Sequence, residues 1–224
     1  MSSWIFKNKV AWLLAWIVSM VSLDQASKVW AQGALTEERT IIRPKEVADE
    51  DGSTKRIEEK TTQFVAVRTI VVIPGLFNFK YAENRAAAFS LTQSIPEGAR
   101  RPLLLSVSLL ACVLIGAWYL RLKYADALLL TSFALIIAGA LGNFIDRARL
   151  HYVIDFLDVY VSNDALAAWL RAQHTVPVLG ISVRLSDHWP TFNVADSCIV
   201  SGAIGVVLRT IRPHPDMPKP SEAA

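Results

Sequence analysis

Four stretches of the chain are apolar for long enough to form membrane-spanning helices. They cover residues 10–31, 102–120, 125–145 and 191–208. A helix needs about 20 mostly apolar residues to cross the hydrocarbon core of a bilayer. Charged residues occur within these stretches only near their ends. The pattern predicts an all-α polytopic membrane protein with four transmembrane helices.

The first stretch admits a second interpretation, as a secretory signal peptide. Lys7 and Lys9 precede an apolar run, as in the positively charged start of such peptides. However, Asp24 and Lys28 would then fall in the cleavage region, and no clean A-x-A site follows. A retained helix over residues 10–31 is therefore preferred.

The distribution of lysine and arginine between the stretches predicts their orientation. Basic residues precede the first stretch, join the second to the third and follow the fourth: Lys7, Lys9, Arg121, Lys123, Arg209, Arg212 and Lys219. By the positive-inside rule these segments, and both termini with them, are cytoplasmic. Arg100 and Arg101, just before the second stretch, count against this orientation but are outnumbered. Residues 32–101 and 146–190 then form two loops on the outer, periplasmic face.

The two outer loops are expected to carry a small β-element. In an insertion at residues 37–60, 14 of 24 residues are charged, which indicates a solvated, mobile segment. β-Branched and aromatic runs follow, interrupted by a Pro-Gly pair, and predict two short strands. Another strand-like run lies within a second insertion at 161–187, after a surface helix expected near 165–173. The chain, 1–224, is thus expected to be a single membrane-embedded domain.

Composition agrees with a membrane protein and disfavours other classes. Hydrophobic residues make up 53% of the 224 residues, and mean hydropathy is +0.34. The net charge of +3 gives no support for nucleic-acid binding. The two cysteines and four histidines show no metal-binding or redox spacing, so no metal and no other cofactor are expected.

Polar residues gather near one end of the predicted spans. Ionisable residues are costly within a bilayer, so they are candidate functional residues by default. With the orientation given above, one layer at the outer boundary collects nine polar residues: Asp24, Lys28, Asn143, Asp146, Arg147, Asp155, Asp158, Asn193 and Asp196. Asp126 begins the third stretch at the cytoplasmic end and is too far away to join them.

These residues also have structural explanations of unequal strength. Asp24 and Lys28 are four residues apart, so an ordinary ion pair on one helix face would explain both. Asp158 is explained equally well as a solvated loop residue. Asp155 in the apolar run YVIDFL, and Asp196 inside the fourth stretch, have the weakest structural explanations.

Two carboxylates in a low-dielectric site are the catalytic device that the sequence favours. No G-x-S-x-G motif, Ser-Lys pattern or reactive cysteine setting is present. When two carboxyl groups lie close together, one stays protonated while the other acts as a base. The base activates a water for attack on a peptide carbonyl, and the acid protonates the developing oxyanion. From their spacing, Asp155 and Asp196 are the preferred pair.

Three rival functions fit the pattern less well. A proton-coupled transporter needs polar residues along a whole transmembrane path, whereas the second and third stretches are apolar through their centres. An intramembrane protease of the G-x-G-D type lacks its motif here. A structural scaffold gives no account of polar clusters that meet at one depth.

Four sequence blocks resemble those of the lipoprotein signal peptidases (signal peptidase II). They are LDQASK at 23–28, NFKYAENRAAAFSL at 78–91, GALGNFIDRARLHYVIDFLDVY at 139–160 and FNVADSCI at 192–199. Members of this family are bacterial membrane aspartyl proteases. They remove signal peptides from prolipoproteins by cleavage just before a lipobox cysteine that bears a diacylglyceryl group.

The resemblance implies that Asp155 and Asp196 form the catalytic dyad, which is the pair chosen above. It implies supporting or substrate-binding roles for residues around the dyad: Asp24, Lys28, Asn84, Gly139, Asn143, Asp146, Arg147, Asn193 and Ala195. It also implies an enzyme of the bacterial inner membrane, with its active site at the outer boundary. Its partners would be a diacylglyceryl-prolipoprotein substrate, membrane lipid and the inhibitor globomycin, without nucleic acid.

The chain departs from the family pattern in three places. Ala86 stands where the family block has a glycine, so the loop after Asn84 is expected to differ if that glycine needs a positive φ. The insertions at 37–60 and 161–187 are longer than expected for the family. The first is interpreted as tolerated growth of a surface loop.

Overall fold

The structure is a computed structural model that describes residues 7–48, 54–85, 96–122, 126–162, 168–169, 175–178, 181–184 and 187–212. Along the chain the elements are α2 (Lys9–Leu35), β1 (Thr36–Ala48), β2 (Thr54–Ala66), β3 (Thr69–Ile73), β4 (Phe77–Asn84), α3 (Glu97–Arg121), α4 (Ala127–Leu150), β5 (Val153–Val159), β6 (Thr175–Val178), β7 (Ile181–Arg184) and α6 (Val194–Ile211). Four helices in this described part are long and apolar enough to cross a membrane. The predicted four-helix pattern is therefore confirmed.

The chain divides into two compact units. The first comprises Met1–Lys28, Glu83–Phe156 and Pro190–Ala224, and it contains most of the four helices. The second comprises Val29–Ala82 and Leu157–Trp189, which contain most of the strands.

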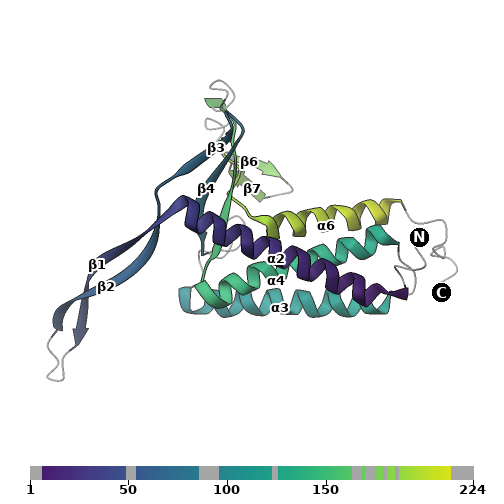
Figure 1. Cartoon of the computed structure of the whole chain (residues 1–224), viewed down its shortest axis with the longest axis horizontal. Coiled ribbons are helices and arrows are strands. Elements are labelled where there is room, and N and C mark those ends of the chain that lie inside the picture. The colour runs from purple at the N-terminus through teal and green to yellow at the C-terminus, as the bar shows by residue number, and fades with distance from the viewer. Residues whose placement is uncertain are drawn as a thin grey trace. The chain divides into compact units, whose positions relative to one another are not determined.

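α4 is the central helix of the first unit and packs against both α3 and α6 (Figure 1). In its apolar window 56% of residues are buried, against 6% in α2 and in α3. The aromatic side chains of Tyr119 and Phe133 form a core cluster with Leu129 and Leu130. Because most apolar side chains of α2 and α3 point outward, these helices suit a lipid environment better than water.

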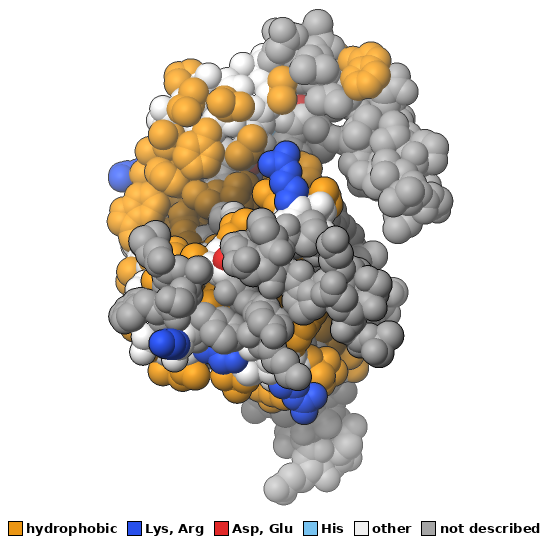
Figure 2. All heavy atoms as spheres, turned by 90° about the vertical axis from the view of Figure 1, so that its right-hand side faces the viewer, with side chains coloured by type: hydrophobic (Ala, Val, Ile, Leu, Met, Phe, Trp, Pro, Cys, Tyr) orange, Lys and Arg blue, Asp and Glu red, His pale blue; other side chains and the backbone are white. Residues whose placement is uncertain are grey.

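One end of the helical unit is where α2 and α4 begin and α3 and α6 end. Lys9 Nζ donates to the carbonyl oxygens of Leu120 and Leu122 at 2.7 and 3.0 Å. Asp126 caps the first turn of α4 and pairs with Arg209 of α6 at 3.0 Å. Figure 2 views this end, where Lys and Arg side chains lie among hydrophobic ones. Asp126 thus lies far from the start of α6, as the sequence predicted.

Helix boundaries differ from the predicted spans because polar residues extend or cap the helices. α3 begins at Glu97, before the apolar stretch, so Pro102 lies inside the helix rather than in its first turn. α4 continues to Leu150 and ends at His151, whose φ of 73° is left-handed. Hydropathy locates only the apolar part of a helix, whereas backbone hydrogen bonds continue into the polar part.

The second unit contains hairpins that were only partly predicted. β3 and β4 pair antiparallel on either side of a turn at residues 74–76, which confirms the two predicted strands. The strand-like run of the second insertion forms β6 and β7, also antiparallel. The surface helix expected near 165–173 lies mostly outside the described residues. β5, which was not predicted as a strand, joins a sheet of order β3-β4-β5.

The charged insertion at 37–60 contributes to a long hairpin rather than an irregular segment. β1 and β2 pair from Thr36 opposite Ala66 to Ala48 opposite Thr54. β-Branched residues recur along both strands, which favours extended backbone. The high charge density obscured this signal in the sequence, since charge alone indicates solvation and not conformation.

Glycines allow α4 and α6 to approach closely. A Cβ on Gly202 would lie 2.5 Å from the carbonyl oxygen of Ser132 and 3.1 Å from the backbone nitrogen of Ile136. Both contacts are to backbone of α4, which cannot move aside as a side chain can. Small residues at such contacts are typical of helices that pack in membranes.

We predict that Gly202→Ala lowers the free energy of unfolding by about 1–3 kcal/mol, because the added methyl group overpacks this contact. The matched control is Gly116→Ala in α3, where a Cβ meets nothing within 4 Å. That control should be neutral or slightly stabilising, since alanine favours a helix. Thermal melts in one detergent measure both. Equal effects of the two substitutions would contradict the packing argument.

Candidate active site

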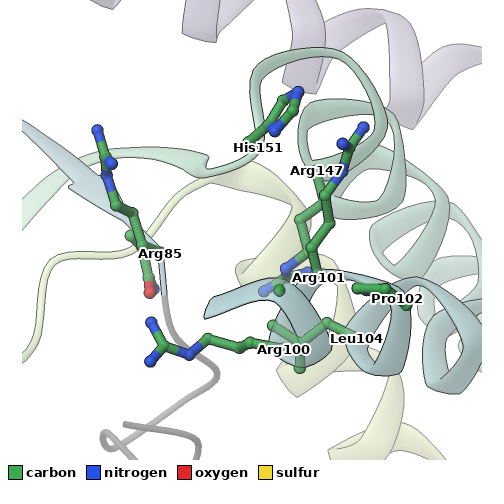
Figure 3. Close-up of a pocket in the computed structure, with 9 residues that line it drawn as sticks. Arg85, Arg100, Arg101, Pro102, Leu104, Arg147 and His151 are labelled. Atoms are coloured by element: carbon green, nitrogen blue, oxygen red, sulfur yellow. The ribbon is translucent and has the colours of Figure 1, made fainter. Parts of the chain in front are cut away.

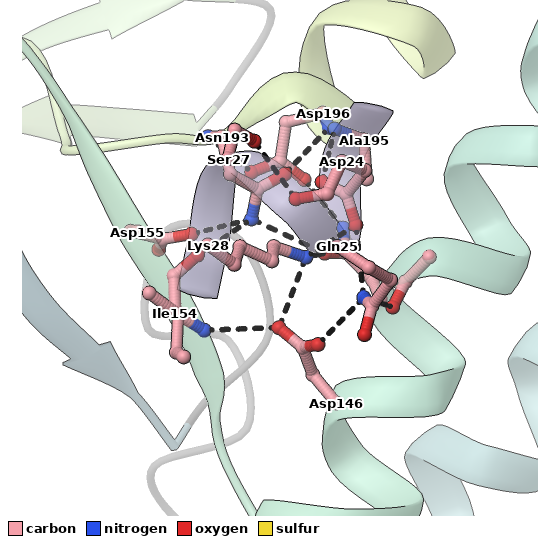
Figure 4. A network of polar contacts seen from close by, with 12 residues as sticks. Asp24, Gln25, Ser27, Lys28, Asp146, Ile154, Asp155, Asn193, Ala195 and Asp196 are labelled. Carbon is pink, nitrogen blue, oxygen red and sulfur yellow. Dashed lines mark hydrogen bonds and ion pairs between the residues drawn. The ribbon is translucent and has the colours of Figure 1, made fainter. Parts of the chain in front are cut away.

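The predicted polar residues gather where α6 begins and α4 leads into β5 (Figure 4). Asp24 and Lys28 come from α2, Asn143 and Asp146 from α4, and Asp155 from β5. Asn193 and Asp196 come from the start of α6. Segments far apart in the sequence therefore supply one hydrogen-bonded cluster.

The centre of the cluster is the buried ammonium group of Lys28. Its Nζ lies 2.9 Å from Asp24 Oδ2 and 2.9 Å from Asp146 Oδ2, and it donates to Asn143 Oδ1 at 3.1 Å. The side chains of the three ionic residues are at most 2% exposed. A lysine ammonium has three N–H donors, so each can be used. Removing one partner of a buried ion pair typically lowers the free energy of unfolding by about 3–5 kcal/mol, because the other charge is left buried and unpaired. Each of the three ionic residues therefore depends on the other two.

The two carboxylates that hold Lys28 also position backbone at the start of α6 and β5. Asp24 Oδ1 accepts from the backbone N–H of Ala195 at 2.9 Å. Asp146 Oδ2 accepts from the backbone N–H of Ile154 at 3.1 Å. Gln25 Nε2 joins the carboxylates, with donor distances of 3.1 Å to Asp24 and 2.9 Å to Asp146. The ion cluster thus sets the place of the residues that follow Ala195 and Ile154.

Asn193 connects Asp155 to Asp196. Its Oδ1 accepts from the backbone N–H of Asp196 at 2.9 Å, and Asp196 Oδ2 accepts from the backbone N–H of Asn193 at 3.3 Å. These two bonds form a capping box at the start of α6. Asn193 Nδ2 donates to Asp155 Oδ1 at 2.7 Å. Asp196 therefore has a structural role as a capping residue, in addition to any chemical role.

Both aspartates are held by neutral amides in the described part of the chain. Asp155 Oδ2 accepts from Asn84 Nδ2 at 2.9 Å, and Asp196 Oδ1 accepts from Asn143 Nδ2 at 2.8 Å. Asp155 is buried, whereas Asp196 is half-buried. This environment contrasts with that of Asp24 and Asp146, which pair directly with a cation.

The pKa of Asp155 is raised to about 7, first by burial and then by the nearby charge of Asp196. Hydrogen bonds from Asn84 and Asn193, and the charge of Lys28, act in the opposite direction. Burial disfavours the charged form of a carboxyl group, while donors and cations favour it. Asp155 is therefore partly protonated near neutral pH, which is the state required of a proton donor.

Small residues let the helices that carry these groups approach closely. A Cβ on Gly139 would overlap the carbonyl oxygen of Ala195. A Cβ on Gly142 would lie 2.6 Å from Asp24 Oδ2 and 3.1 Å from Ala195 Cβ. Larger residues at these positions would push α4 away from α2 and α6.

Most of the predicted site residues are brought together. The cluster described above contains Asp24, Lys28, Asn84, Gly139, Asn143, Asp146, Asp155, Asn193, Ala195 and Asp196. Arg147 lines a pocket together with Asn84. The family-block residues Ala86, Ala88 and Phe89 lie outside the described residues.

Asp158 does not join the hydrogen-bonded cluster that holds Asp155, because its partners are His188 and Asn78. Asp158 belongs to the second unit, where its side chain is 2% exposed and lies 3.0 Å from His188 Nδ1 and 3.4 Å from Asn78 Nδ2. Asp155 and Asp158 are three residues apart on one strand, so their side chains point to opposite faces. Because Asp158 is buried and lies on a strand, the alternative of a solvated loop residue is wrong.

Sequence reasoning missed two members of the cluster, Gln25 and Gly142. Gln25 lies inside the LDQASK block, but an uncharged amide gave no signal that it would bond to Asp24 and Asp146. Gly142 was one of several small residues in α4, and only its contact with Asp24 distinguishes it. The retained first helix is favoured over a cleaved signal peptide, because α6 bonds to its Asp24 and α4 to its Gln25.

Comparison with known proteins decides the family. A family model described as signal peptidase (SPase) II matches residues 16–212. The chain belongs to the signal peptidase II family. This confirms the resemblance seen in the four sequence blocks, and with four apolar helices it indicates a multi-pass bacterial membrane protein.

Individual relatives agree with this assignment. The chain is 37% identical over 162 residues to a lipoprotein signal peptidase of Geobacter metallireducens, which covers 72% of this chain and 83% of the relative. A lipoprotein signal peptidase of Chlorobaculum tepidum is 38% identical over 142 residues, or 63% and 75% of the two chains. A solved bacterial membrane enzyme has a TM-score of 0.58 at 18% identity, covering 94% of this chain and 96% of its own. That likeness supports the fold alone.

Proposed function

We propose that this chain is an aspartic endopeptidase that removes the signal peptide from prolipoproteins. The cut falls just before the lipobox cysteine that carries a diacylglyceryl group. Membership of the signal peptidase II family supports the substrate class, since the relatives are named lipoprotein signal peptidases. The observation that carries the mechanism is the pair Asp155 and Asp196, joined through Asn193 and bonded to amides.

The proposed reaction begins with Asp155 protonated and Asp196 ionised. Asp196 takes a proton from a water molecule, whose oxygen attacks the scissile carbonyl, and Asp155 gives its proton to the developing oxyanion. The proton on Asp196 then passes to the leaving nitrogen as the C–N bond breaks. Asp155 recovers a proton from the diol as the carboxyl product forms, so both groups return to their initial states.

The buried ion cluster has a positioning role in this proposal. Lys28 neutralises charge on Asp24 and Asp146, and these carboxylates hold the N–H groups of Ala195 and Ile154. Each held residue directly precedes one member of the dyad. The separation of the two catalytic carboxyl groups therefore depends on a cluster that does not itself react.

We further propose that both termini are cytoplasmic and that the dyad faces the periplasm in the inner membrane. Lys9, Arg121, Arg209 and Arg212 lie at the opposite end of the helices from the dyad, and the positive-inside rule places them in the cytoplasm. The substrate is anchored by lipid, so its scissile bond lies at the membrane boundary.

This orientation predicts the behaviour of reporter fusions. Alkaline phosphatase, which is active only outside the cytoplasm, should be inactive when fused after Ala224 and active when inserted between β1 and β2. Green fluorescent protein after Ala224 should fluoresce. The reverse pattern would contradict the proposed orientation.

For the dyad, we predict that Asp155→Asn and Asp196→Asn each lower kcat by about 10²–10⁴-fold, because asparagine cannot transfer the proton. Cleavage of a lipidated prolipoprotein by purified protein in detergent measures the loss. Thermal melts of each variant establish that it folds.

The matched control is Asp158→Asn, which removes a buried carboxyl group from the same strand but from the other face. It should retain cleavage if it folds. A folded Asp155→Asn or Asp196→Asn variant with near wild-type kcat would reject the dyad. So would a folded Asp158→Asn variant that loses activity to the same extent.

The pKa of Asp155 predicts the pH dependence of the reaction. The acid form is lost as pH rises through about 7, so kcat/KM should fall on the alkaline side of that value. Asn84→Ala removes a hydrogen bond that favours the ionised form of Asp155, so the pKa of Asp155 should rise. The alkaline limb of the kcat/KM profile should then shift to higher pH by roughly one unit. A limb that stays in place or moves to lower pH would refute this role for Asp155.

A further inference from the structure

We propose that Gln25 is a positioning residue for the proposed dyad and that it acts through Asp24 and Asp146. The amide group of Gln25 lies between these two carboxylates (Figure 4). Each carboxylate in turn holds a backbone N–H group next to one member of the dyad. The inference rests on the proposed function, because it concerns the geometry of the same reaction.

The surroundings of Gln25 determine which end of its amide group faces the carboxylates. Its Nε2 lies 2.9 Å from Asp146 Oδ1, 3.1 Å from Asp24 Oδ2 and 3.3 Å from the carbonyl oxygen of Gly142. Carboxylate and carbonyl oxygens accept hydrogen bonds, so the NH₂ group, which carries two donors, must face them. Gln25 is therefore an uncharged donor to both carboxylates, and it joins α2 to α4.

The bond from Gln25 fixes the orientation of the Asp146 carboxylate. Asp146 Oδ2 lies 2.9 Å from Lys28 Nζ and accepts from the backbone N–H of Ile154 at 3.1 Å. Both contacts are made by one oxygen, so they do not fix the plane of the carboxylate. Within the described part of the chain, Gln25 is the donor that reaches the other oxygen, Oδ1. With bonds at both oxygens the carboxylate has one orientation, and it holds Ile154 in one position.

Asp24 has a similar arrangement at the start of α6. Its Oδ1 accepts from the backbone N–H of Ala195 at 2.9 Å, while its Oδ2 is shared by Lys28 and Gln25. Ala195 and Ile154 directly precede the two members of the dyad. One amide group thus contacts both supports, and the separation of the two catalytic carboxyl groups depends on it. A displacement of about 1 Å in a reacting group can lower a rate by about 100-fold.

Gln25 does not line the pocket beside the dyad. That pocket lies where α3 begins and α4 ends, and its described lining includes Asn84 and Arg147 but not Gln25 (Figure 3). Asn84 also bonds Asp155, so a substrate at the dyad would adjoin this pocket. Loss of the Gln25 amide should therefore slow the chemical step, which kcat measures, and leave KM unchanged.

The test measures cleavage of a lipidated prolipoprotein by full-length protein in detergent, with thermal melts to establish folding. Gln25→Met keeps the length of the side chain and removes its hydrogen bonds. Gln25→Glu introduces a group that donates when it is protonated and only accepts when it is ionised. The matched controls are Gln32→Met and Gln32→Glu. Gln32 is also half-buried on α2, and its side chain makes no hydrogen bond within the described residues.

Gln25→Met should lower kcat by about 10–100-fold at every pH and leave KM within about twofold of the wild type. For Gln25→Glu, kcat relative to the wild type at the same pH should be about one half at pH 5, where the protonated carboxyl group donates. It should fall below about one twentieth at pH 8, where the ionised group repels Asp24 and Asp146. Both Gln32 variants should match the wild type.

The positioning role is overturned if a folded Gln25→Met variant keeps wild-type kcat, or if its KM rises while its kcat does not fall. It is also overturned if the relative kcat of Gln25→Glu does not change with pH. Should Gln25→Met not fold, Gln25→Glu carries the test, because its two forms differ by one proton.

Hydrogen exchange separates this role from the proposed function. The backbone N–H groups of Ile154 and Ala195 should exchange about fivefold faster in Gln25→Met than in the wild type or Gln32→Met, because their acceptors are held less firmly. If the wild type cleaves no prolipoprotein, the proposed function fails and exchange alone decides the positioning role. Unchanged exchange at both N–H groups overturns that role.

Discussion

The buried ammonium group of Lys28 is the interaction on which the site depends. A charge so far from water is stable only when carboxylates and amide oxygens surround it, and here they come from α2 and α4. Those carboxylates use their remaining lone pairs on backbone N–H groups at the start of α6 and of β5. One buried cation therefore fixes the positions in space of the first residues of α6 and β5, which lie far apart in the sequence.

Four carboxylates near one another are divided into two kinds by their partners. Asp24 and Asp146 each form an ion pair with the ammonium group of Lys28. Asp155 and Asp196 face asparagine amides, which orient a carboxyl group without supplying a full charge. Burial can then raise the pKa of Asp155 to about 7. The same residue type thus provides both a rigid support and a pair suited to exchange protons.

Sequence patterns predicted the helices and the turn, which depend on local residue type. They failed for strands whose conformation depends on pairing with another segment. The four helices follow from apolar length, and the turn between β3 and β4 follows from its Pro-Gly pair. The hairpin of β1 and β2 was missed, because its pairing is between strands and leaves no signal in charge density. The helix α3 begins earlier than predicted, because its first turns are polar.

The sequence by itself determined the four apolar helices, the polar residues at their ends and the proposed pair Asp155 and Asp196, because these follow from residue type and order. Only the tertiary structure decided the partners. It pairs Lys28 with Asp146 as well as Asp24, places the half-buried Gln25 in contact with both carboxylates, and turns the side chain of Asp158 away from that of Asp155. These outcomes depend on which face of a strand a side chain occupies and on how closely glycines let helices approach. Neither is set by local sequence.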